Sequence, residues 1–153
     1  MPHLRFAAAK KQRVAVITGG ARGLGRACAQ RIAEEGRHIV LADVLDEEAS
    51  ETVEAIQALG QDGFYCHTDV TDEQAVKNMI LQAMDRFGRI DILVCCAGIL
   101  GLEAPFLEQS ATQFDKVMKI NLYGIYYAHQ AAIPPMLEGG WGRCATITSG
   151  ARH

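Results

Sequence analysis

Short apolar runs alternate with stretches of helical periodicity along most of the chain. An apolar run bounded by glycine or polar residues predicts a buried strand, whereas apolar residues recurring every three or four positions predict a helix. The pattern places strands at residues 14–18, 39–43, 64–68, 90–95 and 144–148. Because crossovers between parallel strands are right-handed, we expect an α/β, doubly wound parallel sheet in the order 3-2-1-4-5.

The helix after Thr71 has the clearest period. Thr71 and Gln74 have the spacing of a capping box, and Gly88 is suited to end the helix. Its apolar stripe comprises Val76, Met79, Ile80, Ala83, Met84 and Phe87. A second helix is expected over residues 47–59, and its pattern indicates a packing role alone. Its inward positions are Ala49, Val53, Ile56 and Leu59.

A longer helix is expected over residues 113–132. Ser110 and Gln113 form another capping-box pattern ahead of it. The Pro134-Pro135 pair should end the helix, because a proline ring cannot continue it.

Length and composition favour one domain. The chain has 153 residues, of which 49% are hydrophobic and 22% charged, which suits a single core. We assign residues 14–153 to this domain and residues 1–13 to a flexible tail, whose basic, acid-free composition leaves an organellar transit segment as the alternative. No apolar run approaches the length of a membrane span, so no membrane association is expected.

Charge and cysteine content narrow the possible partners. The formal net charge of −3 argues against a nucleic-acid surface, which needs an excess of lysine and arginine. The five cysteines are odd in number and have no metal-ligand spacing. They are typical of reduced, buried thiols, which predicts a cytoplasmic protein without a metal site.

The first strand runs into a glycine-rich turn that opens a helix. The turn comprises Thr18, Gly19, Arg22, Gly23, Leu24 and Gly25. Glycines let the backbone approach a pyrophosphate closely, and the N–H groups at a helix start favour its negative charge. The turn therefore predicts a dinucleotide-phosphate site, although a tight strand-to-helix connection would also need small residues here.

The charge around this turn is positive. Arg22, Arg26 and Arg31 lie on or beside the helix, whereas the first acidic residue of the chain is Glu34. Such a field favours a bound phosphate.

Two aspartates stand at the ends of the following strands. Asp43 lies 24 residues after Gly19, where a carboxylate can accept both ribose hydroxyls of NAD. A phosphate on that ribose would meet this charge, so NAD is expected over NADP, with Arg22 as a counterweight. Asp69 and Val70 could meet the adenine edge. Alternatively, Asp43 only caps its strand, and Asp69 only begins a turn.

These motifs resemble those of the classical short-chain dehydrogenase/reductase family, Rossmann-fold oxidoreductases that depend on NAD(P). Residues 18–25 are similar to the family's Thr-Gly-x-x-x-Gly-x-Gly cofactor motif. Residues 95–98, Cys-Cys-Ala-Gly, stand where the family usually has Asn-Asn-Ala-Gly. The resemblance implies cofactor contacts from Cys95, Ala97 and Gly98 near the nicotinamide ribose, without the hydrogen bonds that the asparagine side chains supply.

The resemblance also implies two catalytic positions. Asn121 matches the family's helix asparagine, which holds a water in the proton relay. Ser149 matches the serine after the fifth strand, which hydrogen-bonds the substrate carbonyl or hydroxyl. Each residue has a second interpretation: Asn121 as a buried amide on an apolar stripe that includes Phe114, and Ser149 as a strand-end turn serine.

The family's acid/base pair does not occur in the sequence. In the family, a tyrosine roughly a dozen residues beyond that serine, with a lysine four positions further on, exchanges the proton of the substrate. None of Tyr65, Tyr123, Tyr126 and Tyr127 has a lysine four positions on, and the sequence ends at His153. We therefore expect a domain truncated at its C-terminus and inactive alone.

Three functions remain open. The first is an oxidoreductase that interconverts a secondary alcohol and a ketone with NAD, taking a small-molecule alcohol or ketone in its complete form. The second is a noncatalytic NAD-binding or interaction protein that pairs with full-length relatives. A nucleotide-fold methyltransferase fits less well, because the three glycines and the Ala97-Gly98 pair suit a dehydrogenase.

A homo-oligomer through the helix at residues 113–132 is also expected. This helix has a second apolar line at Ile120, Tyr123, Tyr127 and Ala131, more than one buried face needs. The alternative is that these residues cover a part of the domain that the chain lacks. In a truncated domain, the fifth strand would also be an exposed sheet edge, which favours association.

Overall fold

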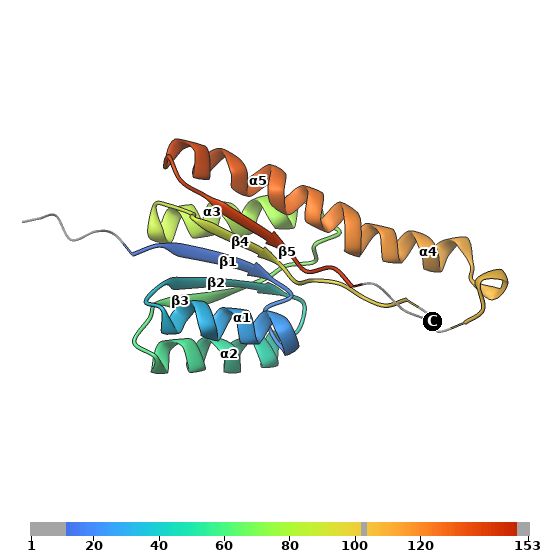
Figure 1. Cartoon of the computed structure of the whole chain (residues 1–153), viewed down its shortest axis with the longest axis horizontal. Coiled ribbons are helices and arrows are strands. Elements are labelled where there is room, and N and C mark those ends of the chain that lie inside the picture. Colours follow the sequence, from blue (N-terminus) through green and yellow to red (C-terminus); the bar gives the residue numbers. More distant parts are fainter. Residues whose placement is uncertain (1–11, 102–103, 150–153) are drawn as a thin grey trace, which may run out of the picture.

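A five-stranded parallel sheet lies between two layers of helices (Figure 1). The structure, a computed structural model, describes residues 12–101 and 104–149. The strands are β1 (Val14–Thr18), β2 (His38–Asp43), β3 (Gly63–His67), β4 (Ile92–Cys95) and β5 (Arg143–Thr146). Their order, β3-β2-β1-β4-β5, confirms the doubly wound fold, and each strand begins and ends within two residues of its predicted position.

The helices cover both faces of the sheet. Those on one face are α1 (Gly23–Glu34) and α2 (Asp46–Ala58), and those on the other are α3 (Glu73–Phe87) and α5 (Gly124–Glu138). The remaining elements are the 3-10 turn η1 (Phe106–Glu108), α4 (Ala111–Met118) and the π-helical turn η2 (Lys119–Tyr123). α4 extends away from the sheet and joins α5 through η2 (Figure 1). No helix in the described part of the chain is long and apolar enough to cross a membrane.

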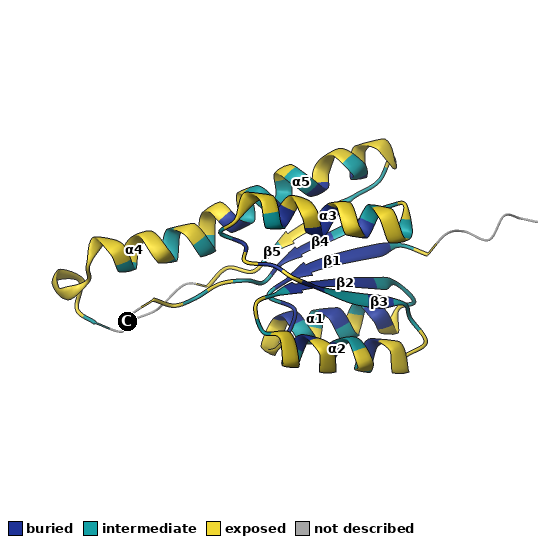
Figure 2. Cartoon of the chain, turned by 180° about the vertical axis from the view of Figure 1, so that it is seen from behind, coloured by how far each residue is buried: buried dark blue, intermediate teal, exposed yellow. Residues whose placement is uncertain are grey.

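Alternation along β1 divides the core in two. Val14 and Val16 pack toward α3 and α5, whereas Ala15 and Ile17 pack toward α1 and α2, and all four side chains are fully buried. A parallel strand covered on both faces is continuously apolar, as this one is. Figure 2 shows the central strands buried and α4 largely exposed.

The expected cap of α3 is wrong by one residue. Asp72, not Thr71, caps the helix, because its carboxylate accepts the backbone N–H groups of both Gln74 and Ala75. The predicted end is confirmed: Gly88 follows α3 in the left-handed region, with φ of 69°.

The expected end of the long helix is also wrong. Pro134 and Pro135 lie inside α5, which continues to Glu138. Ala132 and Met136, on either side of the prolines, are buried in the core. This burial outweighs the two missing backbone hydrogen bonds.

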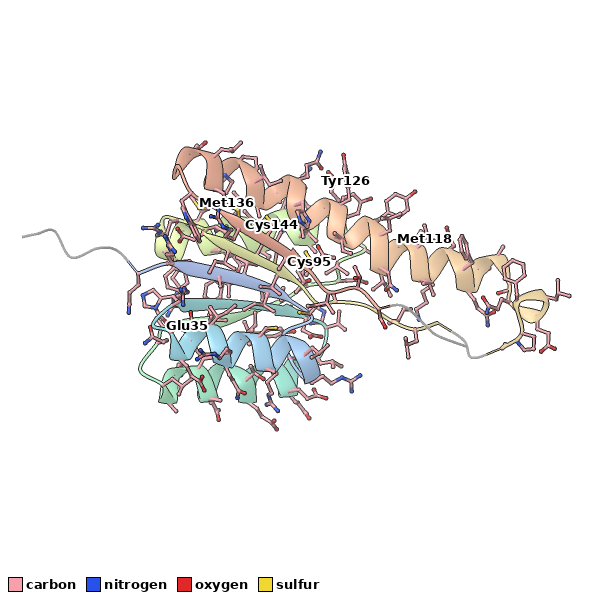
Figure 3. The ribbon with its side chains drawn as sticks, in the orientation of Figure 1. Glu35, Cys95, Met118, Tyr126, Met136 and Cys144 are labelled. Atoms are coloured by element: carbon pink, nitrogen blue, oxygen red, sulfur yellow. The ribbon has the colours of Figure 1, made fainter. Side chains whose placement is uncertain are left out.

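The second apolar line of this helix packs mainly on the protein's own core. Ile120, Tyr127 and Ala131 contact the core, and only Tyr123 of the four is about half exposed. A partner at this helix would therefore meet other side chains than those expected. The outward apolar residues are Leu122, Tyr126, Ile133 and Leu137, of which Tyr126 points away from the sheet (Figure 3).

The chain ahead of β1 is held at the edge of the fold. The Arg13 guanidinium carbon lies 3.5 Å from the centre of the Trp141 ring, a cation–π contact. The last residue of the expected tail thus packs on the domain. Residues 1–11 lie outside the described residues.

A buried carboxylate ties the start of β1 to β4. Asp91, only 2% exposed, accepts the backbone N–H of Val14 at 2.9 Å and the Nε–H of Arg89 at 2.8 Å. A second Arg89 nitrogen binds the other carboxylate oxygen. A buried charge of this kind is tolerable only because both oxygens are occupied.

Replacing this carboxylate should destabilise the domain. Asp91→Ala removes the acceptor of the buried Val14 N–H and the carboxylate that Arg89 binds, and should lower the free energy of unfolding by about 3 kcal/mol. Asp91→Asn keeps the shape and one acceptor oxygen, so the loss should be about half as large. Urea denaturation measures both. Equal losses, or a loss below about 1 kcal/mol for Asp91→Ala, would contradict this account.

Candidate functional site

A cleft of about 460 Å³ opens at the carboxyl ends of the strands. It lies where the chain order reverses between β1 and β4, the place where ligands bind in doubly wound sheets. Ten of the twelve expected cofactor-binding residues line it: Gly19, Arg22, Gly23, Leu24, Gly25, Asp43, Asp69, Val70, Ala97 and Gly98. Thr18 and Cys95 are buried beside the cleft instead.

The glycines of the first turn are required by geometry. Gly23 has a φ of 56°, and a Cβ there would meet open space, so a ligand can approach the backbone. Gly25 has the opposite constraint: a Cβ would lie 1.9 Å from the carbonyl oxygen of Gly19. The start of α1 can therefore reach the turn only if residue 25 is glycine.

The N-terminus of α1 is electrostatically prepared for an anion. No side chain of the described residues caps it, and its first turn contains no acidic residue. By contrast, Asp72 caps α3 and Ser110 caps α4, where the expected capping box with Gln113 is confirmed. The first N–H groups of α1 thus remain available to a ligand in the cleft.

The positive field around this helix is weaker than expected. Arg26 forms an ion pair with Glu51 at 3.0 Å, and Arg31 pairs with two neighbouring glutamates. Of the three arginines, only Arg22 lines the cleft, and it forms no ion pair within the described residues. The local charge for a phosphate therefore comes from Arg22 and the helix terminus.

Asp43 holds the backbone and lines the cleft at once. Its Oδ2 accepts the N–H of Ala21 at 2.9 Å, and its Oδ1 accepts the N–H groups of Val44 at 2.8 Å and Leu45 at 3.2 Å. Three donors fix the carboxylate in place. The strand-end cap and the ligand contact are thus compatible roles for one residue.

Asp69 also has a local role. Its Oδ1 accepts both the backbone N–H and the hydroxyl of Thr71, at 2.9 and 2.8 Å, which forms the turn into α3. Val70, beside it, is 6% exposed and lies against Gly124, where a Cβ would come within 2.8 Å of a Val70 methyl carbon. Both residues line the cleft through this compact packing.

The segment after β4 is tied to the first turn. The backbone N–H of Ala97 points to the Thr18 hydroxyl at 3.4 Å, and that of Cys96 donates to the Thr18 carbonyl at 3.0 Å. A Cβ on Gly19 would lie 2.5 Å from the Ala97 nitrogen, so the two backbones touch. Thr18 therefore acts from beneath the cleft, by joining its two walls.

Cys96, rather than Cys95, is the cysteine of the cleft. Cys95 is 2% exposed, with its Sγ 4.0 Å from His129 Nδ1, whereas Cys96 lines the cleft wall. Burial raises the pKa of Cys96 to about 12, with the neighbouring Cys28 as a smaller cause. The thiol is therefore neutral at pH 7 and does not repel a phosphate.

The cysteines are less uniformly buried than expected. All five are free thiols, but only Cys66 and Cys95 are buried, and Cys144 is exposed. Within the described residues, no group of three or more His, Cys, Asp or Glu side chains is placed to hold a metal ion.

Asn121 binds the segment after β4 through its whole amide group. Its Oδ1 accepts the N–H of Ile99 at 2.9 Å, and its Nδ2 donates to the Ile99 carbonyl at 2.8 Å. The residue lies in the π-helical turn η2, and such turns are frequent at functional sites. Phe114, expected on the same apolar stripe, is 59% exposed.

Ser149 lies three residues beyond the end of β5. It is exposed and does not line the cleft. Because β5 is parallel to β4, Ser149 follows the same end of the sheet as Ala97 and Gly98.

The sequence missed several residues of the cleft wall. These are Ala42, Val44, Leu45, Thr68, Cys96, Ile99 and Ile120. Most of them are sequence neighbours of site residues predicted at strand ends, and this adjacency could have identified them. Ile120 had none, because it reaches the cleft through the packing of η2 rather than through a motif.

The chain matches known proteins along nearly its whole length. The family model for short chain dehydrogenase matches residues 13–153. A 2-dehydro-3-deoxy-L-rhamnonate dehydrogenase (NAD(+)) of Sphingomonas sp. is 36% identical over 94% of this chain and 56% of that protein. A 2,5-dichloro-2,5-cyclohexadiene-1,4-diol dehydrogenase of Sphingobium indicum is 39% identical over 90% of this chain and 54% of its own length.

A solved structure gives the same result. An NAD+-bound xylitol dehydrogenase superposes with a TM-score of 0.87 at 30% identity, covering 92% of this chain and 55% of that one. The chain thus spans about half the length of the relatives it matches. With its parallel sheet, glycine turn and cleft, it belongs to the short-chain dehydrogenase family of oxidoreductases.

Proposed function

We propose that this chain binds NAD in the cleft at the carboxyl ends of its strands. The observation that carries the proposal is the uncapped N-terminus of α1, held against the turn by Gly25 and open to a ligand at Gly23. A pyrophosphate fits there, because N–H donors and a helix dipole converge where no Cβ obstructs it. Two relatives are described as acting with NAD(+) or binding NAD+, which supports the choice of cofactor.

The remaining lining divides between the two halves of the dinucleotide. Asp43 is proposed to accept the adenosine ribose hydroxyls, with Asp69 and Val70 at the adenine edge. Ala97 and Gly98 are proposed to face the nicotinamide ribose, where the absence of large side chains permits close approach. Arg22 would lie beside the phosphates.

The complete reaction of the family type is a further proposal. Bound NAD would accept or return a hydride, so the substrate class is a secondary alcohol or the corresponding ketone. Asn121 is proposed to support the relay from its π-helical turn, and Ser149 to hydrogen-bond the substrate oxygen. The sequence contains no Tyr-x-x-x-Lys pair, so we propose cofactor binding rather than turnover for this chain alone.

A homo-oligomer through the α4–α5 region is proposed as well. Leu122, Tyr126, Ile133 and Leu137 are exposed on this helical segment. β5 pairs only with β4 among the described strands, and most of it is exposed. The same open surfaces favour the second candidate function, a noncatalytic protein that pairs with longer relatives.

The five free thiols support a cytoplasmic location.

Replacing Gly25 by alanine tests the proposed cofactor site. The unaltered chain should bind NAD in isothermal titration calorimetry, and Gly25→Ala should weaken binding by about a hundredfold or more, since its Cβ would overlap the Gly19 carbonyl. Gly139→Ala is the matched control, because residue 139 has a φ of −73° and a Cβ there contacts nothing closer than 3.4 Å. No binding by the unaltered chain, or equal binding by Gly25→Ala, would refute the site.

The charge of Asp43 should set the cofactor preference. A 2′-phosphate of about two negative charges some 4 Å from the carboxylate costs about 2 kcal/mol in water, so NADP should bind roughly thirtyfold more weakly than NAD. Asp43→Asn should reduce this difference between the affinities for NAD and NADP, even if each affinity changes. Titration with both cofactors measures it. An unaltered chain that binds NADP as tightly as NAD would contradict the proposal.

A charge on the outer face of α5 should separate an oligomer. Sedimentation velocity of the unaltered chain should show a dimer or larger species, and Tyr126→Glu should shift it to monomer, because a buried carboxylate in an apolar interface is unfavourable. Leu59, expected to face inward, is instead 43% exposed at the end of α2, on the other side of the sheet, so Leu59→Glu places the same charge there and should have no effect. A monomeric unaltered chain would rule out self-association.

A further inference from the structure

A buried hydroxyl links α2 to the glycine turn. Thr52, in the middle of α2, is 0% exposed and does not line the cleft. Its hydroxyl oxygen lies 2.9 Å from the carbonyl oxygen of Ala21, 31 residues earlier in the chain. The sequence pattern of α2 predicted only a packing helix, so this polar contact has no counterpart in the motifs.

The peptide groups of Ala21 are held from two sides. The Ala21 N–H donates to Asp43 Oδ2 at 2.9 Å, and the Ala21 carbonyl accepts from Thr52. Ala21 is fully buried, and no other donor among the described residues reaches its carbonyl oxygen. Residue 21 sits within the turn, between Gly19 and Gly23, so these two bonds hold the backbone that lines the phosphate side of the cleft.

Two acceptors compete for the single hydroxyl hydrogen of Thr52. Two carbonyl groups lie 2.9 Å away, those of Ala21 and Glu48. The Glu48 carbonyl already faces the backbone N–H of residue 52 within the helix, whereas the Ala21 carbonyl depends on the hydroxyl. Arg26 donates its Nε–H to the same hydroxyl oxygen at 2.6 Å, which leaves the hydroxyl to act as the donor toward Ala21.

Arg26 is itself fixed at the surface. Its Nη2 forms an ion pair with Glu51 at 3.0 Å, on the same helix as Thr52. α1, α2 and the turn between β1 and α1 are therefore joined through one hydroxyl group.

We propose that Thr52 is a positioning residue for cofactor binding, which holds the glycine turn in its binding conformation through the Ala21 carbonyl. The inference rests on the proposed function, since it assigns a supporting residue to the same NAD site. A turn that is already ordered loses less conformational entropy when the dinucleotide binds, so a rigid Ala21 raises affinity without touching the ligand.

The test compares three variants of the full 153-residue chain. Thr52→Val has nearly the same shape but no hydroxyl, and Thr52→Ser restores the hydroxyl. Val53→Ala is the matched control: it truncates the neighbouring residue of α2, which packs on the core. NAD affinity is measured by calorimetry, stability by thermal unfolding, and turn order by hydrogen exchange at the Ala21 amide without cofactor.

Thr52→Val should weaken NAD binding about tenfold and speed exchange at the Ala21 amide by a similar factor, while Thr52→Ser stays close to the unaltered chain. Val53→Ala should lower the unfolding temperature but leave the affinity for NAD unchanged. This separation distinguishes positioning from general destabilisation, which would affect Thr52→Val and Val53→Ala alike.

Two results would overturn the inference alone: NAD affinity in Thr52→Val equal to that of the unaltered chain, or unchanged exchange at the Ala21 amide. Absence of NAD binding by the unaltered chain would overturn the proposed function and this inference together. If Thr52→Val does not fold, Arg26→Met carries the test from the surface. It should weaken NAD binding about threefold by releasing the hydroxyl, and an unchanged affinity would count against the proposal.

Discussion

The close approach of Gly25 to the carbonyl oxygen of Gly19 is the contact on which the candidate site depends. With no Cβ at residue 25, the first turn of α1 can lie directly against the end of β1. A larger residue would push the helix outward and move its N–H groups away from the cleft. The contact thus couples a packing requirement to a chemical one, because the same absence of a side chain admits the helix and leaves its terminus open to an anion.

Hydrogen bonds position the second wall of the cleft, together with the packing of Cys96 and Ala97 on the core. Thr18 receives the N–H of Ala97, and Asn121 holds both polar groups of the Ile99 backbone. The segment after β4 has no regular structure of its own, so its backbone groups need such partners. The π-helical turn brings Asn121 to this segment, which explains why a helix defect persists at that point of the chain.

Most charged side chains in and around the cleft are already paired or hydrogen-bonded within the protein. The carboxylate oxygens of Asp43 accept hydrogen bonds from three backbone N–H groups. Two of the three arginines near α1 form ion pairs with glutamates. Burial keeps the Cys96 thiol protonated. Among the described residues that line the cleft, the cation is therefore Arg22, and the carboxylates are those of Asp43 and Asp69.

The sequence by itself determined the order of the elements, the strand positions to within two residues, and the glycine turn, because these follow from hydrophobic periodicity and from backbone conformations that only glycine adopts. It also predicted Asp43, from its place at a strand end, and the Ala97-Gly98 pair, from its resemblance to the family motif, as site residues, and all three line the cleft. Only the tertiary structure decided that α5 continues through Pro134 and Pro135, that Asp72 caps α3, and that Thr52 reaches Ala21. Each of these depends on contacts between elements, which local propensity and spacing do not contain.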